Sequence, residues 1–237
     1  SASLMRQAIV QVQHHVSHRS AFQRRLIDQP LMRNVIADMV LESEAALNLS
    51  LRVARAVDNQ NSNEDERSFA RISTAISKYW ITKRAPYLVF EALECHGGPG
   101  YIEESIMPRL YREAPLNSIW EGSGNVMCLD VLRALQRDKN ALPALFRELA
   151  SAKGSNKNFD ESFSHLKETL QDPIDLEIEA RLLTEKMACL IQASIFIKSG
   201  EEEKISAFCN SRLGPRWSGA FGTLPTDTSF EYIMGGI

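Results

Sequence analysis

The chain has 237 residues, 44% hydrophobic and 24% charged, which is the balance of a globular protein with one large domain or two small ones. No run approaches the roughly 20 apolar residues of a membrane span, and no secretory signal is visible. The net charge is −3, and residues 137–237 carry twelve Lys and Arg against fifteen Asp and Glu, which argues against a nucleic-acid-binding surface. We expect a cytoplasmic protein, or a mitochondrial one if its source is eukaryotic.

Hydrophobic periodicity predicts helices from the start of the chain. One helical face, with spacings of four, three and four, consists of Met5, Ile9, Val12 and Val16. Residues 19–30 then form a basic loop, whose three arginines could bind an anionic phosphate or could simply be solvated. A second helix begins at Pro30 and runs to about Asp58. Its predicted apolar stripe consists of Met32, Ile36, Met39 or Val40, Leu47, Leu51 and Ala54.

The middle of the chain predicts one more long helix, followed by turns. Residues 59–65 form a polar turn with capping residues, and the next helix has a face made of Phe69, Ile72, Ile76 and Tyr79. Pro86 should kink or divide this helix near Ala85. Gly97 and Gly98 can end it in a left-handed conformation, and Pro99-Gly100 suits a type II turn. Residues 103–112 predict a short helix.

The pattern stays helical beyond residue 137. Two further faces consist of Phe159, Phe163, Leu166 and Leu170, and of Ala180, Leu183, Met187 and Leu190. A shorter helix is expected over residues 201–211, and residues 214–228 are a loop rich in Gly, Pro and Thr. No alternating strand pattern, repeat or low-complexity segment is present. The sequence therefore predicts an all-α fold.

The candidate metal ligands do not form a convincing site. His14, His15 and His18 lie close together, but no carboxylate or cysteine nearby completes a ligand set. The four cysteines have no C-x-x-C spacing and fall within or near helical patterns, so we expect reduced, mostly buried thiols.

The main candidate for a functional segment is Trp120-Glu121-Gly122-Ser123. Ser123 suits the N-cap of a helix that continues through Leu135, which places Glu121 on a loop just before a helix N-terminus. These residues alone leave two interpretations open. Glu121 is either a functional carboxylate that the glycines make accessible or a surface glutamate stabilised by the helix dipole.

Four motifs follow one another along the chain: Arg19-x-x-Phe22, Glu94-x-x-Gly97-Gly98-x-Gly100-Tyr101, Arg109-x-x-Arg112-Glu113 and Trp120-Glu121-Gly122-Ser123. Their order resembles the C-terminal helical domain of the acyl-CoA dehydrogenase family. The amino acids at positions 109–125 and the extra helical tail are similar to those of the AidB-like branch of that family. The resemblance implies an antiparallel helical bundle over residues 1–136 and an additional helical domain over residues 137–237.

The resemblance also implies chemistry. Glu121 matches the family's general base, which removes the α-proton of an acyl-CoA thioester while a β-hydride passes to FAD. Arg19 and Phe22 match a segment that reaches the FAD pyrophosphate and adenine of a neighbouring subunit, which implies a homo-oligomer. The other positions that match FAD contacts are Glu94, Gly98, Ser123 and Asn125. Gln23 stands where the family usually has glycine, and Glu94 where it usually has glutamine.

The family also has an N-terminal helical domain and a middle β-domain, and these 237 residues include neither. We therefore expect the isolated chain to hold no FAD and to be inactive, although the parent protein would bind FAD. Two alternatives stay open. One is a DNA-binding, protective protein with a vestigial flavin site, which the acidic tail disfavours because phosphate neutralisation needs a basic face. The other is a helical interaction module without chemistry.

Overall fold

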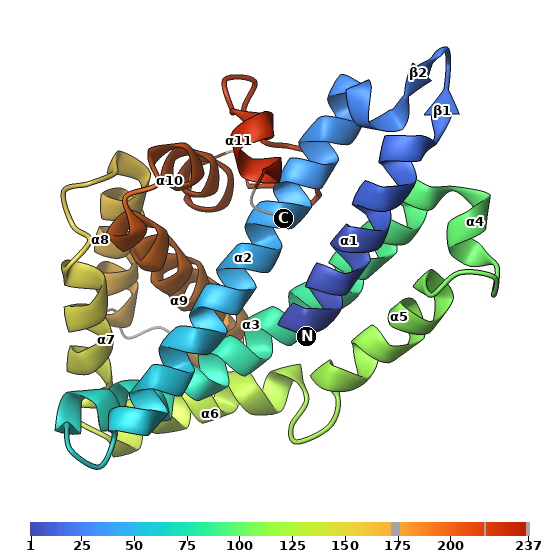
Figure 1. The fold of residues 1–237 in the computed structure, drawn as a ribbon. Coiled ribbons are helices and arrows are strands. Elements are labelled where there is room, and N and C mark those ends of the chain that lie inside the picture. Colours follow the sequence, from blue (N-terminus) through green and yellow to red (C-terminus); the bar gives the residue numbers. More distant parts are fainter. Residues whose placement is uncertain (172–175, 216, 236–237) are drawn as a thin grey trace.

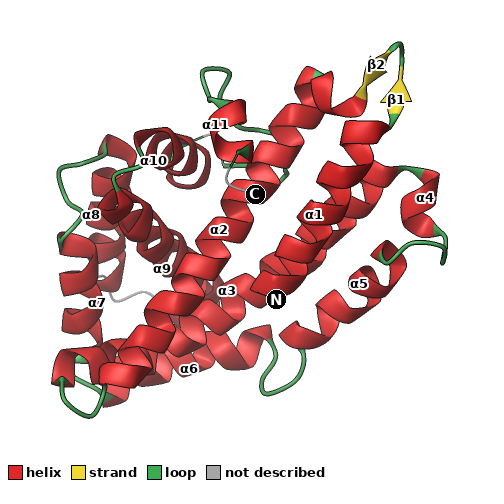
Figure 2. Cartoon of the chain, viewed as in Figure 1, coloured by secondary structure: helices red, strands yellow, loops and turns green. Residues whose placement is uncertain are grey.

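The computed structural model describes residues 1–171, 176–215 and 217–235, which are helical apart from one short hairpin and connecting loops (Figure 1, Figure 2). The predicted all-α fold is confirmed. In chain order, the elements are α1 (Ala2–His18), β1 (Ser20–Ala21), β2 (Arg24–Arg25), η1 (Leu26–Asp28), α2 (Pro30–Asn59), α3 (Glu64–His96), α4 (Gly98–Tyr101), α5 (Met107–Glu113), η2 (Ala114–Ser118), α6 (Gly124–Arg137), α7 (Ala141–Ala150), α8 (Lys157–Gln171), α9 (Leu176–Ser199), α10 (Glu202–Phe208), η3 (Cys209–Leu213) and α11 (Phe230–Met234). The elements η1 and η2 are 3₁₀ helices, and η3 is a π-helix.

Helices α1, α2 and α3 pack together and frame the bundle (Figure 1). The two faces predicted for α1 and α3 are buried, since periodic apolar side chains leave water together when helices pack. The polar turn before α3 also behaves as predicted. The side-chain oxygen of Asn63 accepts hydrogen bonds from the backbone N–H groups of Asp65 (2.9 Å) and Glu66 (3.2 Å), which caps the helix.

The apolar stripe predicted for the second half of α2 is wrong. Leu47 and Leu51 are 49% and 59% exposed, whereas Leu49 and Val53 are buried. The reason is geometric. Helix α2 has 30 residues and α1 only 17, so the second half of α2 extends past the N-terminus of α1 and packs on α3 and α9 instead. The change of neighbours turns a different face inward.

Of the two outcomes predicted at Pro86, a kink or a division, the division is wrong, because α3 continues through Pro86 to His96. A proline inside a helix costs about 3 kcal/mol, and the burial of Ala85, Leu88 and Val89 around it offsets that loss. Gly97 ends α3 at a positive φ of 65°, as expected.

The segment after α3 departs from the predicted turn and helix. Residues Gly98–Tyr101 form the short helix α4 rather than a type II turn, and the following helix α5 starts only at Met107.

The basic loop after α1 contains a small antiparallel hairpin in which Ser20 pairs with Arg25. Its two turn residues, Phe22 and Gln23, have φ values of 52° and 65°, the left-handed conformation that tight hairpin turns require. Figure 2 shows these strands as a protruding tip beyond α1 and α2. We expected a loop here, because two-residue strands are too short to show alternation.

The helices that follow Arg137 pack directly on the first part of the chain. Helix α9 contacts α2, α3 and α6, and α11 contacts α2. The predicted inward residues of α8 and α9 are buried, with Leu170 only partly covered. The two parts of the chain therefore share one continuous hydrophobic core.

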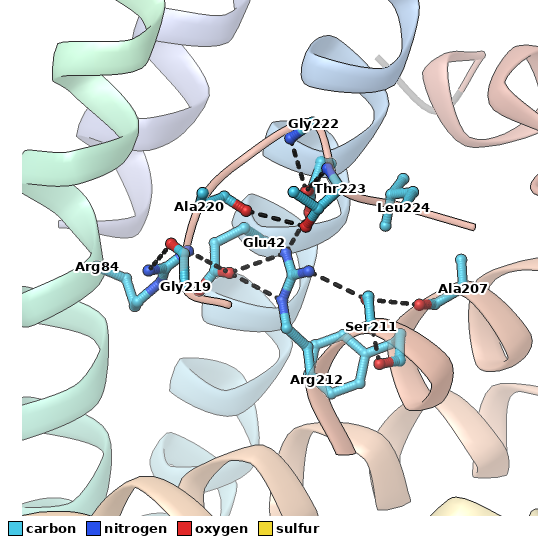
Figure 3. A network of polar contacts seen from close by, with 12 residues as sticks. Glu42, Arg84, Ala207, Ser211, Arg212, Gly219, Ala220, Gly222, Thr223 and Leu224 are labelled. Carbon is cyan, nitrogen blue, oxygen red and sulfur yellow. Dashed lines mark hydrogen bonds and ion pairs between the residues drawn. The ribbon is translucent and has the colours of Figure 1, made fainter. Parts of the chain in front are cut away.

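A buried ionic network joins these two parts (Figure 3). Nη2 of Arg212 lies 3.1 Å from a carboxylate oxygen of Glu42 and also pairs with Asp38, and Arg84 of α3 donates to the same Glu42 oxygen at 3.3 Å. The backbone N–H of Gly222 donates to Asp38 at 2.9 Å. Burial alone would raise the pKa of Glu42, but the attraction of Arg84 and Arg212 outweighs burial and lowers that pKa.

All four cysteines are buried free thiols, as predicted. Burial raises the pKa values of Cys95 and Cys209 to about 12, which keeps these thiols protonated and unreactive at neutral pH. Among the described residues, no group of three or more His, Cys, Asp or Glu side chains could hold a metal ion. None of the helices in this part of the chain has the length and apolar character to cross a membrane.

Candidate functional site

The loop that carries Glu121 is held in an unusual backbone conformation. It connects η2 to α6, and Glu121 has a φ of 53° although it is not a glycine. Gly122 follows with a φ of 109°, a value that other residues rarely adopt. A left-handed conformation at a non-glycine residue such as Glu121 costs about 1–3 kcal/mol and persists only where the surroundings enforce it.

Lys78 of α3 contacts this loop. Its ammonium group donates one hydrogen bond to the backbone oxygen of Trp120 at 2.9 Å and another to that of Gly122. These two carbonyl groups stand on either side of Glu121. Burial lowers the pKa of Lys78, although the nearby carboxylate of Glu121 acts in the opposite direction. No pattern in the sequence predicts this contact, because Lys78 and the loop are far apart in the chain.

Ser123 and Asn125 stand at the start of α6. Ser123 occupies the N-cap position as predicted, but its side chain makes no capping hydrogen bond. The side-chain oxygen of Asn125 accepts a hydrogen bond of 2.8 Å from Nε of Arg181, which comes from α9. The tail beyond Arg137 therefore reaches the end of the loop that carries Glu121. Arg181 is the second residue at this loop that the sequence did not reveal.

The hairpin carries Arg19 and Phe22 at its base and tip. The Phe22 side chain is 91% exposed, and Arg19, Arg24 and Arg25 are exposed around it. Arg25 pairs with Asp28 at 2.9 Å. An exposed ring beside guanidinium groups offers a stacking surface and donors for an anionic group.

Glu94 and Gly98 lie near the base of this hairpin. The rings of His15 and His96 are 4.8 Å apart, which brings the ends of α1 and α3 together. Both Glu94 and Gly98 are exposed, and the space around Gly98 is open. The side of α4 facing away from the bundle is thus accessible next to the hairpin (Figure 1).

The predicted site residues fall into two groups rather than one pocket. Lys78, which contacts the Glu121 loop, and Glu94 are more than four turns apart on α3, roughly 24 Å at 1.5 Å per residue. In Figure 1 the hairpin and α4 lie at the upper right, and the loop before α6 lies at the bottom. Glu121, Ser123 and Asn125 form one group. Arg19, Phe22, Glu94 and Gly98 form the other.

Comparison with known proteins identifies the family of this chain. Residues 1–136 match the family model described as acyl-CoA dehydrogenase, C-terminal domain. This chain belongs to the acyl-CoA dehydrogenase family. It is 39% identical over 216 residues to AidB of Escherichia coli (strain K12), which supports the predicted AidB-like resemblance. That match covers 91% of this chain but 39% of AidB, so the chain spans well under half the length of that relative.

Solved structures of family members share the fold. ACDH-11 of Caenorhabditis elegans, solved in complex with C11-CoA, superposes with a TM-score of 0.80 at 24% identity, over 93% of this chain and 43% of its own. An acyl-CoA dehydrogenase from Bacillus anthracis, solved with FAD, gives a TM-score of 0.67 at 17% identity, over 91% of this chain and 45% of its own. Both matches extend over most of the helices beyond the acyl-CoA dehydrogenase bundle.

Proposed function

We propose that this chain is the C-terminal part of an FAD-dependent acyl-CoA dehydrogenase in which Glu121 is the general base. The observation that carries the proposal is the Glu121 loop. A left-handed glutamate, held through its neighbours' carbonyl groups, is the kind of local strain that proteins retain at functional sites. Membership of the family and the complex of ACDH-11 with C11-CoA support an acyl-CoA substrate.

In the proposed reaction, Glu121 removes the proton from the carbon next to the thioester carbonyl. The thioester makes this C–H bond more acidic, and a carboxylate becomes a stronger base when water is removed from around it. Ile119 and Trp120, both largely exposed beside Glu121, supply apolar surface that would exclude water once substrate covers the loop. FAD, when bound, supplies the acceptor for the hydride from the β-carbon.

The residues present suit FAD as the cofactor. The exposed ring of Phe22 and the guanidinium of Arg19 match the needs of an adenine ring and a pyrophosphate. Their hairpin projects away from its own bundle, which favours contact with the FAD of a neighbouring subunit and hence a homo-oligomer (Figure 1). Ser123 and Asn125 would contact the FAD of their own subunit. Glu94 and Gly98 would complete the hairpin group.

We further propose that the 237-residue chain alone holds no FAD and is inactive, because in the family the flavin lies between this domain and a β-domain. Flavin absorbance that copurifies with the chain would contradict this expectation.

The test is Glu121→Gln in the full-length protein. We expect turnover of an acyl-CoA to fall by about 10²–10⁴-fold with flavin absorbance retained, because the amide cannot accept the proton. Glu104→Gln, which changes an exposed glutamate outside the loop, is the matched control. Unchanged turnover in Glu121→Gln would refute the assigned role. A wild-type protein without any turnover would instead favour the vestigial-site alternative.

A further inference from the structure

Lys78 contacts the backbone of the Glu121 loop and not the Glu121 carboxylate. Its ammonium contacts the carbonyl oxygens of Trp120 and Gly122, the residues directly before and after Glu121. The Glu121 carboxylate itself has no hydrogen bond or ion pair with any described residue. Lys78 therefore holds the backbone of the base and leaves its side-chain oxygens free.

We propose that Lys78 is a positioning residue for Glu121, which acts by clamping the two carbonyl groups that flank the base. This inference rests on the proposed function, since it assigns a role to Lys78 in the reaction that Glu121 performs.

The clamp excludes an extended backbone at Glu121. Two oxygens that both bond to one nitrogen are at most about 6 Å apart. Carbonyl groups two residues apart on an extended chain point the same way but lie roughly 6.6 Å from each other. The ammonium of Lys78 therefore cannot bond both oxygens of an extended chain, and it can do so when the chain folds back at residue 121, as it does here with a left-handed φ at Glu121.

Lys78 also belongs to a well-packed helix, which limits how far its backbone can move. Lys78 lies near the middle of α3, and its neighbours Ser77, Tyr79 and Trp80 are buried. On the other side, Gly122 packs against Met127 and Val126 of α6, so that a Cβ atom there would displace the end of the Met127 side chain. The loop is thus fixed between two helices, α3 through Lys78 and α6 through packing.

A backbone clamp also has a chemical advantage over an ion pair. Lys78 and the Glu121 carboxylate attract each other through space, but a lysine paired directly with the carboxylate would also cover an oxygen that has to accept the proton. Contact through the carbonyl groups orients the carboxylate without occupying its oxygens. Loss of the clamp should therefore reduce the rate of the chemical step more than it reduces substrate binding, because a displacement of about 1 Å can cost 10²-fold in rate.

The first experiment uses the chain as it stands. NMR chemical shifts of the Glu121 backbone distinguish left-handed from extended geometry, and they can be compared among wild type, Lys78→Met, Lys78→Arg and the exposed control Lys153→Met. Methionine matches the length of lysine but donates no hydrogen bond, whereas arginine retains donors. We expect Lys78→Met alone to lose the left-handed shifts. Left-handed shifts that persist in Lys78→Met would overturn the clamp.

The second experiment uses the full-length protein with FAD bound. We expect Lys78→Met to lower kcat by about 10–100-fold with KM changed less than about threefold, and Lys78→Arg to recover most of the rate. An unchanged kcat, or a loss confined to KM, would refute the positioning role. If the wild-type protein shows no turnover, the proposed function fails. In that case the NMR comparison still decides whether Lys78 holds the loop.

Discussion

Arg212 forms an ion pair with Asp38 although 174 residues separate them in the chain, and both side chains are sealed from solvent. Asp38 belongs to the segment that matches the family model, and Arg212 belongs to the residues beyond it. With Glu42 and Arg84, the network holds two positive and two negative side chains. We propose that residues 137–237 form an addition to the family bundle that is fastened to it by this network.

The network predicts a large difference between two arginine substitutions. Arg212→Met should lower the free energy of unfolding by about 3–5 kcal/mol, because it leaves buried carboxylates without their partner. Arg147→Met should cost less than about 1 kcal/mol, since Arg147 and Asp65 are both more than half exposed. Urea unfolding measures both values, and similar losses in the two variants would contradict the role of the network.

Glu42 of this network and Glu148, which pairs with Arg52 and Lys198 elsewhere in the fold, predict sensitivity to acid. Burial alone would raise the pKa values of Glu42 and Glu148, yet their cationic partners outweigh it and lower both. A lowered pKa in the folded state stabilises the fold above the unfolded-state pKa, about 4.3, and this contribution is lost as the pH falls through the folded-state pKa. The melting temperature should therefore drop below about pH 4. Glu148→Gln should reduce that drop, whereas Glu104→Gln should leave it as in wild type.

Two glycines of the short helix α4 should respond differently to alanine. A Cβ atom at Gly100 would collide with the backbone oxygen of Leu93 and lie 2.9 Å from Cβ of His96, whereas nothing lies within 4 Å of one at Gly98. We expect Gly100→Ala to destabilise the chain by about 1–3 kcal/mol. Gly98→Ala should stay within about 0.5 kcal/mol of wild type. Thermal unfolding of both variants provides the comparison, and equal stability would show that α4 can shift to make room.

We expect Phe22 to contribute to FAD binding and not to the stability of the fold. Because its side chain is 91% exposed, Phe22→Ala should change the free energy of unfolding by less than about 0.5 kcal/mol. If the hairpin stacks on FAD of a neighbouring subunit, the same change should weaken FAD binding in the full-length protein. Leu31→Ala, which removes an 80% exposed side chain near the hairpin, is the control. Equal FAD affinity in the two variants would count against the hairpin contact.

The sequence predicted those features that depend on local periodicity and capping. The buried face of α1, the start of α2 at Pro30 and the Asn63 cap are confirmed, because each is set within a few residues. The exposed face of α2 was missed, and the sequence left open whether Pro86 kinks or divides its helix, which is continuous. In both cases the decisive contacts come from α9 or from core packing, which sequence periodicity does not report.

The candidate site was predictable only in part. The motif around Glu121 and the Ser123 position were visible, but the φ of Glu121 and the contacts of Lys78 and Arg181 were not. Lys78 belongs to α3 and contacts the loop from there. Arg181 belongs to α9 and follows its partner Asn125 by 56 residues in the chain. Such pairs follow from how helices are arranged, and no single segment of sequence encodes them.

The separation between Asp38 and Arg212 also sets an order of events during synthesis. Ribosomes add about 5–20 residues per second, so α2 emerges on the order of ten seconds before Arg212. During that interval Asp38 cannot enter a dry core as an ion pair, because Arg212 does not yet exist, and Glu42 has only Arg84 as its partner. The side of α2 that carries Asp38 must therefore stay hydrated until Arg212 has been synthesised. Closure of this part of the core is thus a late step in folding.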